Sequence, residues 1–212
     1  MRIDTWVDVA CPWCFVNKKR LEDAIAASGH AEEIDLVLHT FELDPSAPRV
    51  AMSNPEYIGR AMGMPASKVI GFEAQLRSLA AAEGLDFTSE RVVARTVDTL
   101  RLVHLAAEYD AARSFFGTVQ AGLFAGRTDA YSEEFLIDAA ERAGVPRDRA
   151  VAVLKGTEYA GAVAADRAAA LKLGAQGAPF TMIDERYGVP GVISTDAYRD
   201  AITRAFSERA SA

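Results

Sequence analysis

Cysteine and histidine are scarce in this 212-residue sequence, which contains two cysteines and three histidines. Zinc sites usually take four cysteine or histidine ligands at short, characteristic spacings, and this chain has no second cysteine pair. The gap between His30 and His39 is longer than the three to five residues typical of a zinc-binding histidine pair, and His104 is farther away still. The sequence therefore predicts no metal site.

Long apolar segments and an excess of positive charge are also lacking. No apolar run approaches the ~20 residues of a membrane span. The formal net charge is −7, which disfavours nucleic acid or an anionic membrane surface as a partner. Residues 1–6 read as a strand rather than as the apolar core of a signal peptide, so we expect a cytoplasmic protein. Half of the residues are hydrophobic and a quarter are charged, as in an ordinary globular protein.

Both cysteines lie in the segment Cys11-Pro12-Trp13-Cys14, between a strand-like and a helix-like run. Residues i and i+3 share one face of a helix, so the two thiols lie within disulfide reach. At a helix start, free N–H groups and the helix dipole stabilise a thiolate. We therefore predict that Cys11 is the exposed, attacking thiolate and that Cys14 is the more buried, resolving thiol. Pro12 suits the first helical turn, and Trp13 adds apolar bulk beside the sulfur.

Three alternatives for the cysteine pair are a zinc half-site, a structural disulfide and two unreactive core thiols. A disulfide that closes so short a loop adds little stability. The Pro-Trp insert at a helix start argues against unreactive core cysteines. Lys18, one turn after Cys14, either influences thiol ionisation or is a lysine whose stem packs along the helix edge.

Apolar periodicity predicts strands over residues 1–9 and 34–41 on either side of a helix from Pro12 to Ala27. Such a strand–helix–strand unit favours parallel pairing with a right-handed crossover. The remaining helices are predicted at about 66–83, 89–112, 114–125, 133–143, 147–155, 158–173 and from 194 onward, and the remaining strands at 180–183 and 187–190. We divide the chain into residues 1–45 and 158–212, which form one α/β domain in two parts, and a helical insertion at 46–157.

Ala178-Pro179 lies directly before the predicted strand at 180–183. With the cysteine pair and the element order, it completes a pattern that resembles the DsbA family of thioredoxin-like oxidoreductases, in particular its FrnE-like branch. The segments that carry the resemblance, in the order of the family, are Asp8 to Phe15, Lys18-Lys19-Arg20-Leu21-Glu22, Phe41-Glu42-Leu43-Asp44-Pro45, Ala81-Ala82-Glu83-Gly84-Leu85, Thr99 to His104, and Gly177 to Asp184.

The resemblance implies an α/β thioredoxin-like fold, with a central mixed sheet flanked by helices and a large, all-helical DsbA-type insertion over the active site. The redox cysteines of the family correspond to Cys11 and Cys14. Its cis-proline corresponds to Pro179, so we expect Ala178-Pro179 to be cis, beside the cysteines, with the Ala178 backbone pairing with a substrate peptide. The sequence departs from the branch at Asn17 and Glu185, where glycine is common.

The expected function is that of an enzyme, a thiol–disulfide oxidoreductase or isomerase of the DsbA type. It needs no bound cofactor or metal and exchanges electrons with an external thiol reductant or oxidant. The partners implied are protein or peptide disulfides and thiols, or a small-molecule thiol, and a homodimer is compatible with the superfamily. Related glutathione transferases of the kappa class and hydroxychromene-carboxylate isomerases carry serine at the position of Cys11, which favours redox exchange here.

Two other functions stay open at this point. The first is a reductase, transferase or isomerase that uses a low-molecular-weight thiol on a small molecule. The second is a chaperone-like or redox-sensing binding module. His104 also has two interpretations, because it shares a helical face with Val93, Val97 and Leu100. It is either a packed core residue or a group in the cleft over Cys11 that stabilises the thiolate.

Overall fold

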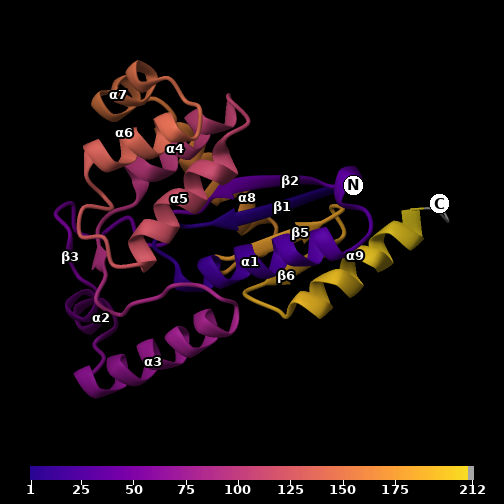
Figure 1. Cartoon of the computed structure of the whole chain (residues 1–212), viewed down its shortest axis with the longest axis horizontal. Coiled ribbons are helices and arrows are strands. Elements are labelled where there is room, and N and C mark those ends of the chain that lie inside the picture. Colours follow the sequence, from indigo (N-terminus) through magenta and orange to yellow (C-terminus); the bar gives the residue numbers. More distant parts are fainter. Residues whose placement is uncertain (210–212) are drawn as a thin grey trace.

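A four-stranded sheet in the order β2-β1-β5-β6 forms the centre of the protein (Figure 1). The computed structural model describes residues 1–209, apart from the side chains at positions 62 and 66. The strands are β1 (Arg2–Val7), β2 (Asp35–Thr40), β5 (Phe180–Ile183) and β6 (Tyr187–Pro190). β2 pairs parallel to β1, while β5 pairs antiparallel to both β1 and β6. The predicted mixed sheet and its parallel first pair are confirmed.

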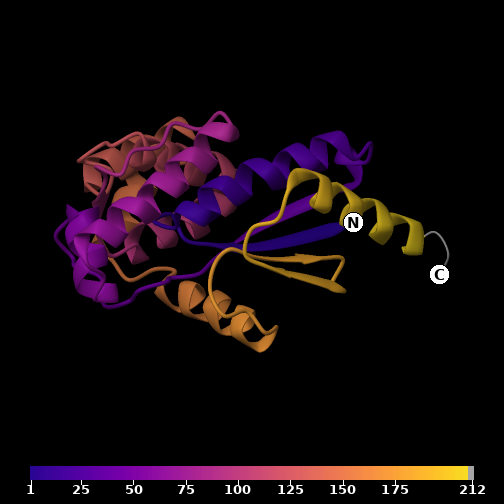
Figure 2. The ribbon, with the colours of Figure 1, turned by 90° about the horizontal axis from the view of Figure 1, so that it is seen from below.

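Helices cover both faces of this sheet (Figure 2). α1 (Pro12–Ala27) and α9 (Thr195–Arg209) pack side by side on one face. Their buried side chains meet Ile3 and Ile183 of the strands in one apolar cluster. α8 (Ala160–Lys172) lies on the opposite face, over a smaller cluster that includes Trp6 and Phe180. The sheet is therefore covered on both faces, and its central strands β1 and β5 are largely buried.

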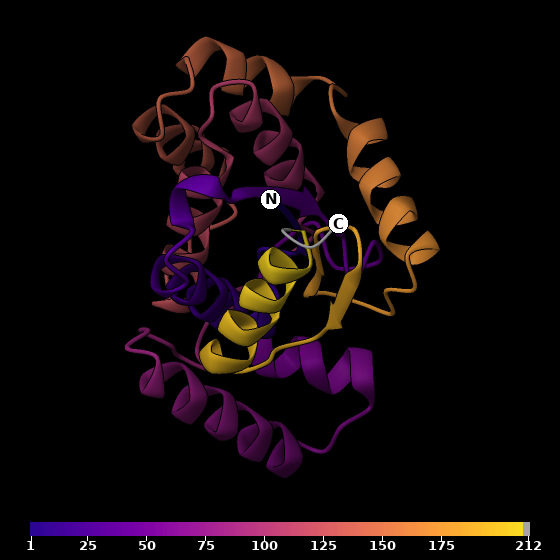
Figure 3. The same cartoon turned by 90° about the vertical axis from the view of Figure 1, so that its right-hand side faces the viewer.

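The segment between β2 and α8 forms two groups of helices beside one end of the sheet. The first group holds β3 (Met52–Ser53), α2 (Asn54–Met62), α3 (Ala66–Ala82) and β4 (Val92–Val93). The second is a bundle of α4 (Val97–Ala107), α5 (Ala112–Phe124), α6 (Glu133–Arg142) and α7 (Arg147–Lys155). Figure 3 shows the α2–α3 pair and the bundle on opposite sides of the central strands. A short 3-10 helix, η1 (Ala31–Glu33), precedes β2.

The prediction of a single helix over residues 89–112 is wrong. Residues 92–93 form β4, which pairs antiparallel with β3, and α4 begins only at Val97. The backbone donors and acceptors of this stretch bond to a neighbouring segment, since the Arg91 carbonyl accepts from Asn54 N–H and Arg95 N–H donates to the Pro48 carbonyl. The insertion is consequently not all-helical. The sequence did not predict this ribbon, because two residue pairs are too short to leave a periodic pattern.

The other predicted helices agree with the structure to within about two residues at each end, but α2 was not predicted. It begins after an N-cap at Ser53 with Pro55 in its first turn, where proline is tolerated. None of the helices within residues 1–209 is long and apolar enough to cross a membrane.

Candidate active site

Cys11 is the N-cap residue of α1, and Pro12 is its first helical residue. The backbone of Cys11 is extended, and its Sγ accepts a hydrogen bond of 3.3 Å from the Cys14 N–H. The sulfur thereby takes the place of the oxygen that normally caps a helix start. Because the free N–H groups and the helix dipole point at this atom, negative charge on Cys11 Sγ is stabilised.

Cys14 lies one turn farther along α1 and is fully buried. Burial raises the pKa of its thiol well above the usual value, and the neighbouring Cys11 adds to the shift. A hydrogen bond from the Asp8 backbone acts in the opposite direction. Cys14 is therefore held as a neutral thiol close to Cys11, in the position expected for the resolving residue.

Cys11 is also buried, with only 3% of its surface exposed. The prediction of an exposed Cys11 is thus wrong, because the loop that carries Ala178 and the α2–α3 pair cover it. Its thiol donates a hydrogen bond of 3.4 Å to the Ala178 carbonyl. The Ala178–Pro179 peptide bond is cis, as predicted from the sequence. The four residues assigned to the cysteine segment and the Ala178–Pro179 pair are thus brought together by the fold.

A cavity of about 410 Å³ gives access to Cys11. Trp13 and Ala178 border it on the cysteine side, and Tyr57, Ile58 and Phe72 border it from α2 and α3. The Trp13 and Phe72 rings meet edge to face, with their centroids 6.4 Å apart. The walls are mainly apolar and aromatic, which is typical of a pocket for a small molecule or for one side chain of a peptide.

A polar group at the same cavity is the carboxylate of Asp8, which the sequence analysis did not single out. It is 1% exposed and accepts hydrogen bonds from Leu43 N–H (2.8 Å), Ala10 N–H (3.1 Å) and Thr96 Oγ1 (3.1 Å). Burial raises the pKa of Asp8 to about 6, although these hydrogen bonds favour the charged form. The only feature of the sequence that could have drawn attention to Asp8 is its position three residues before a cysteine of the predicted redox pair.

A buried ion pair supports the wall formed by α3. Arg91 and Glu73 are each 3% exposed, and the guanidinium bonds both carboxylate oxygens at 2.6 and 3.1 Å. The Arg91 guanidinium also lies over the Phe87 and Phe124 rings. This pair connects α3 to the segment before β4, and so holds the cover of the cavity to the rest of the protein.

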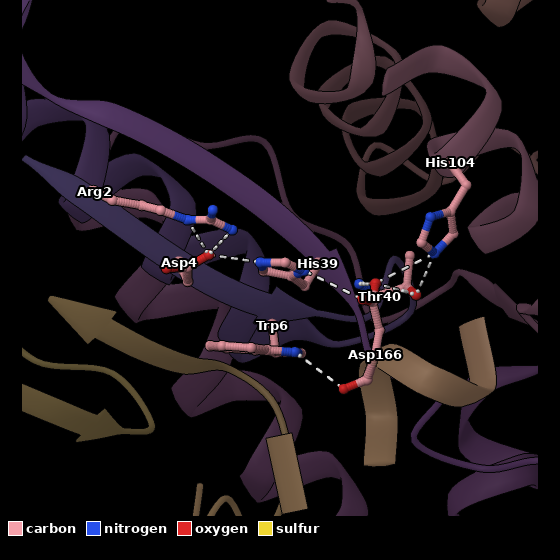
Figure 4. Close-up of polar contacts among 7 residues, drawn as sticks. All are labelled: Arg2, Asp4, Trp6, His39, Thr40, His104 and Asp166. Atoms are coloured by element: carbon pink, nitrogen blue, oxygen red, sulfur yellow. Dashed lines mark hydrogen bonds and ion pairs between the residues drawn. The ribbon is translucent and has the colours of Figure 1, made fainter. Parts of the chain in front are cut away.

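The two predicted modulators, His104 and Lys18, do not border this cavity. His104 Nε2 lies 3.2 Å from Asp166 Oδ2 and 3.1 Å from Thr40 Oγ1, on the side of the sheet covered by α8 (Figure 4). Lys18 forms an ion pair with Glu22 at 2.8 Å on the outside of α1. The structure thus places His104 in a polar network rather than in the cleft over Cys11.

That network joins several elements through Asp166 of α8. Its carboxylate accepts from Thr40 N–H at 2.8 Å and lies 3.2 Å from His39 Nδ1, while its carbonyl accepts from Trp6 Nε1 at 3.1 Å. His39 Nε2 in turn lies 2.7 Å from Asp4 Oδ1 (Figure 4). The network fastens α8 to the sheet. Within residues 1–209, no group of three or more His, Cys, Asp or Glu side chains is arranged to hold a metal ion.

A model of the DSBA-like thioredoxin domain matches residues 2–203. A probable DsbA oxidoreductase from Streptomyces coelicolor is 36% identical, with a TM-score of 0.92 over 99% of this chain and 91% of that one. No curated protein sequence matches significantly.

Two more distant structures show the same fold. A cytosolic disulfide reductase, DsbM, from Pseudomonas aeruginosa with GSH is 18% identical (TM-score 0.64, all of both chains). A 2-hydroxychromene-2-carboxylate isomerase is 14% identical (TM-score 0.68, all of this chain and 98% of that one). At this identity the likeness concerns the fold alone.

Proposed function

This chain belongs to the DSBA-like thioredoxin domain family, and from that premise we propose that it catalyses thiol–disulfide exchange through Cys11 and Cys14. The observation that carries the proposal is the position of Cys11 Sγ. It accepts the Cys14 N–H at the start of α1 and faces the Ala178 carbonyl beside a cis-proline. In this proposal Cys11 supplies the attacking sulfur, Cys14 supplies the resolving sulfur, and the Ala178 backbone pairs with the substrate.

In the reducing direction, the Cys11 thiolate attacks one sulfur of a substrate disulfide. The other substrate sulfur leaves as a thiolate, and a mixed disulfide forms on Cys11. Cys14 then loses its proton and attacks Cys11 Sγ, which releases the second substrate thiolate and leaves a Cys11–Cys14 disulfide. The substrate gains two electrons and the dithiol loses two. The reverse sequence donates a disulfide, and an external thiol reductant or oxidant restores the starting state.

A second candidate substrate class, a low-molecular-weight disulfide or thiol, is favoured by the burial of Cys11. Its sulfur is reached through the 410 Å³ cavity, whose volume suits a small molecule. A folded protein with a disulfide on a rigid surface would first have to displace α2 and α3. We therefore rank small disulfides and extended peptides above folded substrates. A redox-sensing or chaperone-like role would use the same cavity without turnover.

We expect a cytoplasmic enzyme, like the cytosolic disulfide reductase DsbM. In such a reducing compartment a lone cysteine pair is more often catalytic than structural. We expect no bound cofactor. Residues 1–45 and 158–212 would form the redox domain, and residues 46–157 would form the insertion that covers it. A homodimer is compatible with this arrangement.

The first test measures disulfide exchange in the wild type, Cys11→Ser and Cys14→Ser, with glutathione disulfide and with a disulfide-linked extended peptide. We expect Cys11→Ser to abolish turnover and Cys14→Ser to stop at a stable mixed disulfide, detected by mass spectrometry. Turnover that persists in Cys11→Ser would refute the proposal. Client protection that survives in the double serine variant, in a wild type without turnover, would favour the binding module instead.

The same preparation gives the equilibrium reduction potential, followed through the fluorescence of Trp13 beside the sulfur. A value near ~−270 mV, as for thioredoxin, would indicate a reductase in the cytosol. A value near ~−120 mV, as for DsbA, would indicate an oxidant or isomerase. The absence of a reversible two-electron transition would remove the redox function.

A further inference from the structure

Asn17 of α1 is a buried amide to which the exchange steps above give no role. It is 1% exposed, and its Oδ1 accepts a hydrogen bond of 2.7 Å from the Tyr198 hydroxyl of α9. Within the part of the chain that the structure describes, no group accepts a hydrogen bond from Asn17 Nδ2. Because buried donors in folded proteins are nearly always paired, either with protein or with ordered water, an acceptor is expected at this atom.

The Tyr198 hydroxyl is one member of a chain of buried hydroxyl groups beneath α1. It lies 3.4 Å from Thr181 Oγ1 of β5, which in turn lies 3.2 Å from Thr5 Oγ1 of β1. The two threonines are partners in the antiparallel β1–β5 pair, and all three hydroxyl-bearing residues are buried. The chain of hydrogen bonds therefore runs from Asn17 through α9 and β5 to β1.

Each hydroxyl in this chain carries one proton, so the direction of every hydrogen bond is fixed. Burial raises the pKa of Tyr198, which therefore keeps its proton and gives it to Asn17 Oδ1. Thr181 must then donate to Tyr198, and Thr5 must donate to Thr181. At one end of the chain Thr5 Oγ1 keeps a lone pair for a donor, and at the other end Asn17 Nδ2 keeps a hydrogen for an acceptor.

Both ends of the chain border the same small cavity, which lies between α1, strands β1 and β2, and α5. Its volume is about 20 Å³. The stem of Lys18 also borders it and packs against Gly117 of α5, where a Cβ would lie only 3.2 Å from Lys18 Cε. A water molecule needs at least ~10–15 Å³ and two or more polar partners, so the cavity has room for one.

We propose that this cavity binds one water molecule, which accepts from Asn17 Nδ2 and donates to Thr5 Oγ1. The hydrogen bonds of the chain and those of the water then form a closed ring, in which each hydroxyl donates once and accepts once. Hydrogen bonds in such a series polarise and strengthen one another. The opposite orientation of the Asn17 amide would reverse every donor and acceptor and would require a water molecule at the same place.

The ring joins the two segments that carry the candidate active site. Asn17 lies one turn after Cys14 on α1, and Thr181 follows Pro179 by two residues at the start of β5. The water would thus hold the helix of the cysteines to the strand that follows the cis-proline, with α9 as the third member. This role does not depend on the exchange activity proposed above or on its substrate.

A high-resolution crystal structure of the full-length wild type tests the site directly. We expect one peak of water density at hydrogen-bond distance, about 2.7–3.2 Å, from both Asn17 Nδ2 and Thr5 Oγ1. A dry cavity would overturn the inference. A water molecule bound only to the Lys18–Glu22 pair at the edge of the cavity would do the same.

Hydrogen exchange of the β5 amides tests the ring in solution. Asn17→Leu removes the donor to the water and Thr5→Val removes its acceptor, so each should speed exchange at least ~5-fold. The double variant should fall well short of the product of these two factors, because the water bridges the two residues only when both are present. Thr5→Ser is the matched control, since it keeps the hydroxyl, and should stay within ~2-fold of the wild type.

Single effects that multiply in the double variant would show that Asn17 and Thr5 act independently, and the inference would fail. Exchange that is as fast in Thr5→Ser as in Thr5→Val would also contradict it, because the hydroxyl would then have no part in holding β5. If a variant does not fold, the density in the wild type still decides.

Discussion

Asp166 of α8 and His39 of β2 are 127 positions apart in the sequence, and their side chains meet with 3.2 Å between Asp166 Oδ1 and His39 Nδ1. The imidazole stacks on Trp6 at 4.6 Å and contacts Asp4 with its other nitrogen. A histidine between two carboxylates is thus part of the joint that holds α8 to the sheet. α8 leads into the loop that carries Ala178, so this joint lies one connection away from the active site.

Stability should fall at alkaline pH because of His39. Its two carboxylate partners outweigh burial and raise the pKa to about 9. A group whose pKa is higher in the folded state stabilises fully below its unfolded pKa of ~6.5, and this contribution disappears as the pH rises through about 9. We expect a loss on the order of 2–3 kcal/mol between pH 6 and 10. Urea denaturation at several pH values measures it.

The comparison for this prediction is His39→Gln, which should be less stable at pH 6 and should lack this part of the pH dependence. His30→Gln is the matched control, since His30 lies near the surface, where it pairs with the single carboxylate of Glu33 and stacks on the Phe206 ring. If the free energy of unfolding changed with pH in the same way in the wild type and in His39→Gln, the pH dependence could not be assigned to His39.

The hairpin between β5 and β6 should become more stable in Glu185→Gly. Asp184 and Glu185 have positive φ angles of 53° and 56°, a conformation that non-glycine residues adopt at a cost. Arg186 N–H donates to the Ile183 carbonyl, so Asp184 and Glu185 are the central residues of a β-turn, and Asp-Gly is a preferred pair where both central residues have positive φ. We expect a gain of about 0.5–1 kcal/mol, measured by thermal or chemical denaturation. Glu32→Gly is the control, because Glu32 does not have a positive φ angle, and we expect it to lower the free energy of unfolding. If Glu185→Gly lowered the free energy of unfolding as well, this explanation would be contradicted.

Breaking the buried Glu73–Arg91 pair should loosen the cover of the cavity. Removal of one partner leaves an uncompensated buried charge, so Glu73→Gln should destabilise by about 3 kcal/mol. Limited proteolysis should then cut within α2 and α3 first. The double variant Glu73→Leu, Arg91→Met should lose less than the two single variants together, because no charge stays buried. Additive losses would show that the two residues act independently.

Filling the cavity should inhibit exchange with small disulfides. Ile58 of α2 borders the cavity, and Ile58→Trp adds bulk in front of Cys11. We expect the second-order rate constant with glutathione disulfide to fall at least ~10-fold, since overpacking a site excludes its ligand. Ile70→Trp is the control, because Ile70 lies in α3 outside this cavity and is 70% exposed. Equal rates in the two variants would mean that small disulfides reach Cys11 by another route.

Much of the fold could be predicted because it depends on local patterns. The alternation of Ile3, Thr5 and Val7 identifies β1, and the Cys11-Pro12 pair at the head of an apolar stripe locates α1. The insertion was harder, since Arg91 to Thr96 reads as helix but bonds to neighbouring segments instead. Propensity is a weak signal where tertiary hydrogen bonds compete with it.

The sequence by itself determined the chemistry available to this protein: two thiols at disulfide spacing on a helix start, and a proline before the third strand of the sheet. Only the tertiary structure decided how that chemistry is enclosed. It buried Cys11 beneath a cavity, gave His104 to Asp166 rather than to the cysteines, and placed Asp8 beside Cys14. The physical reason is that spacing along a helix is local, whereas burial and the pKa shifts that follow from it depend on residues far apart in the chain.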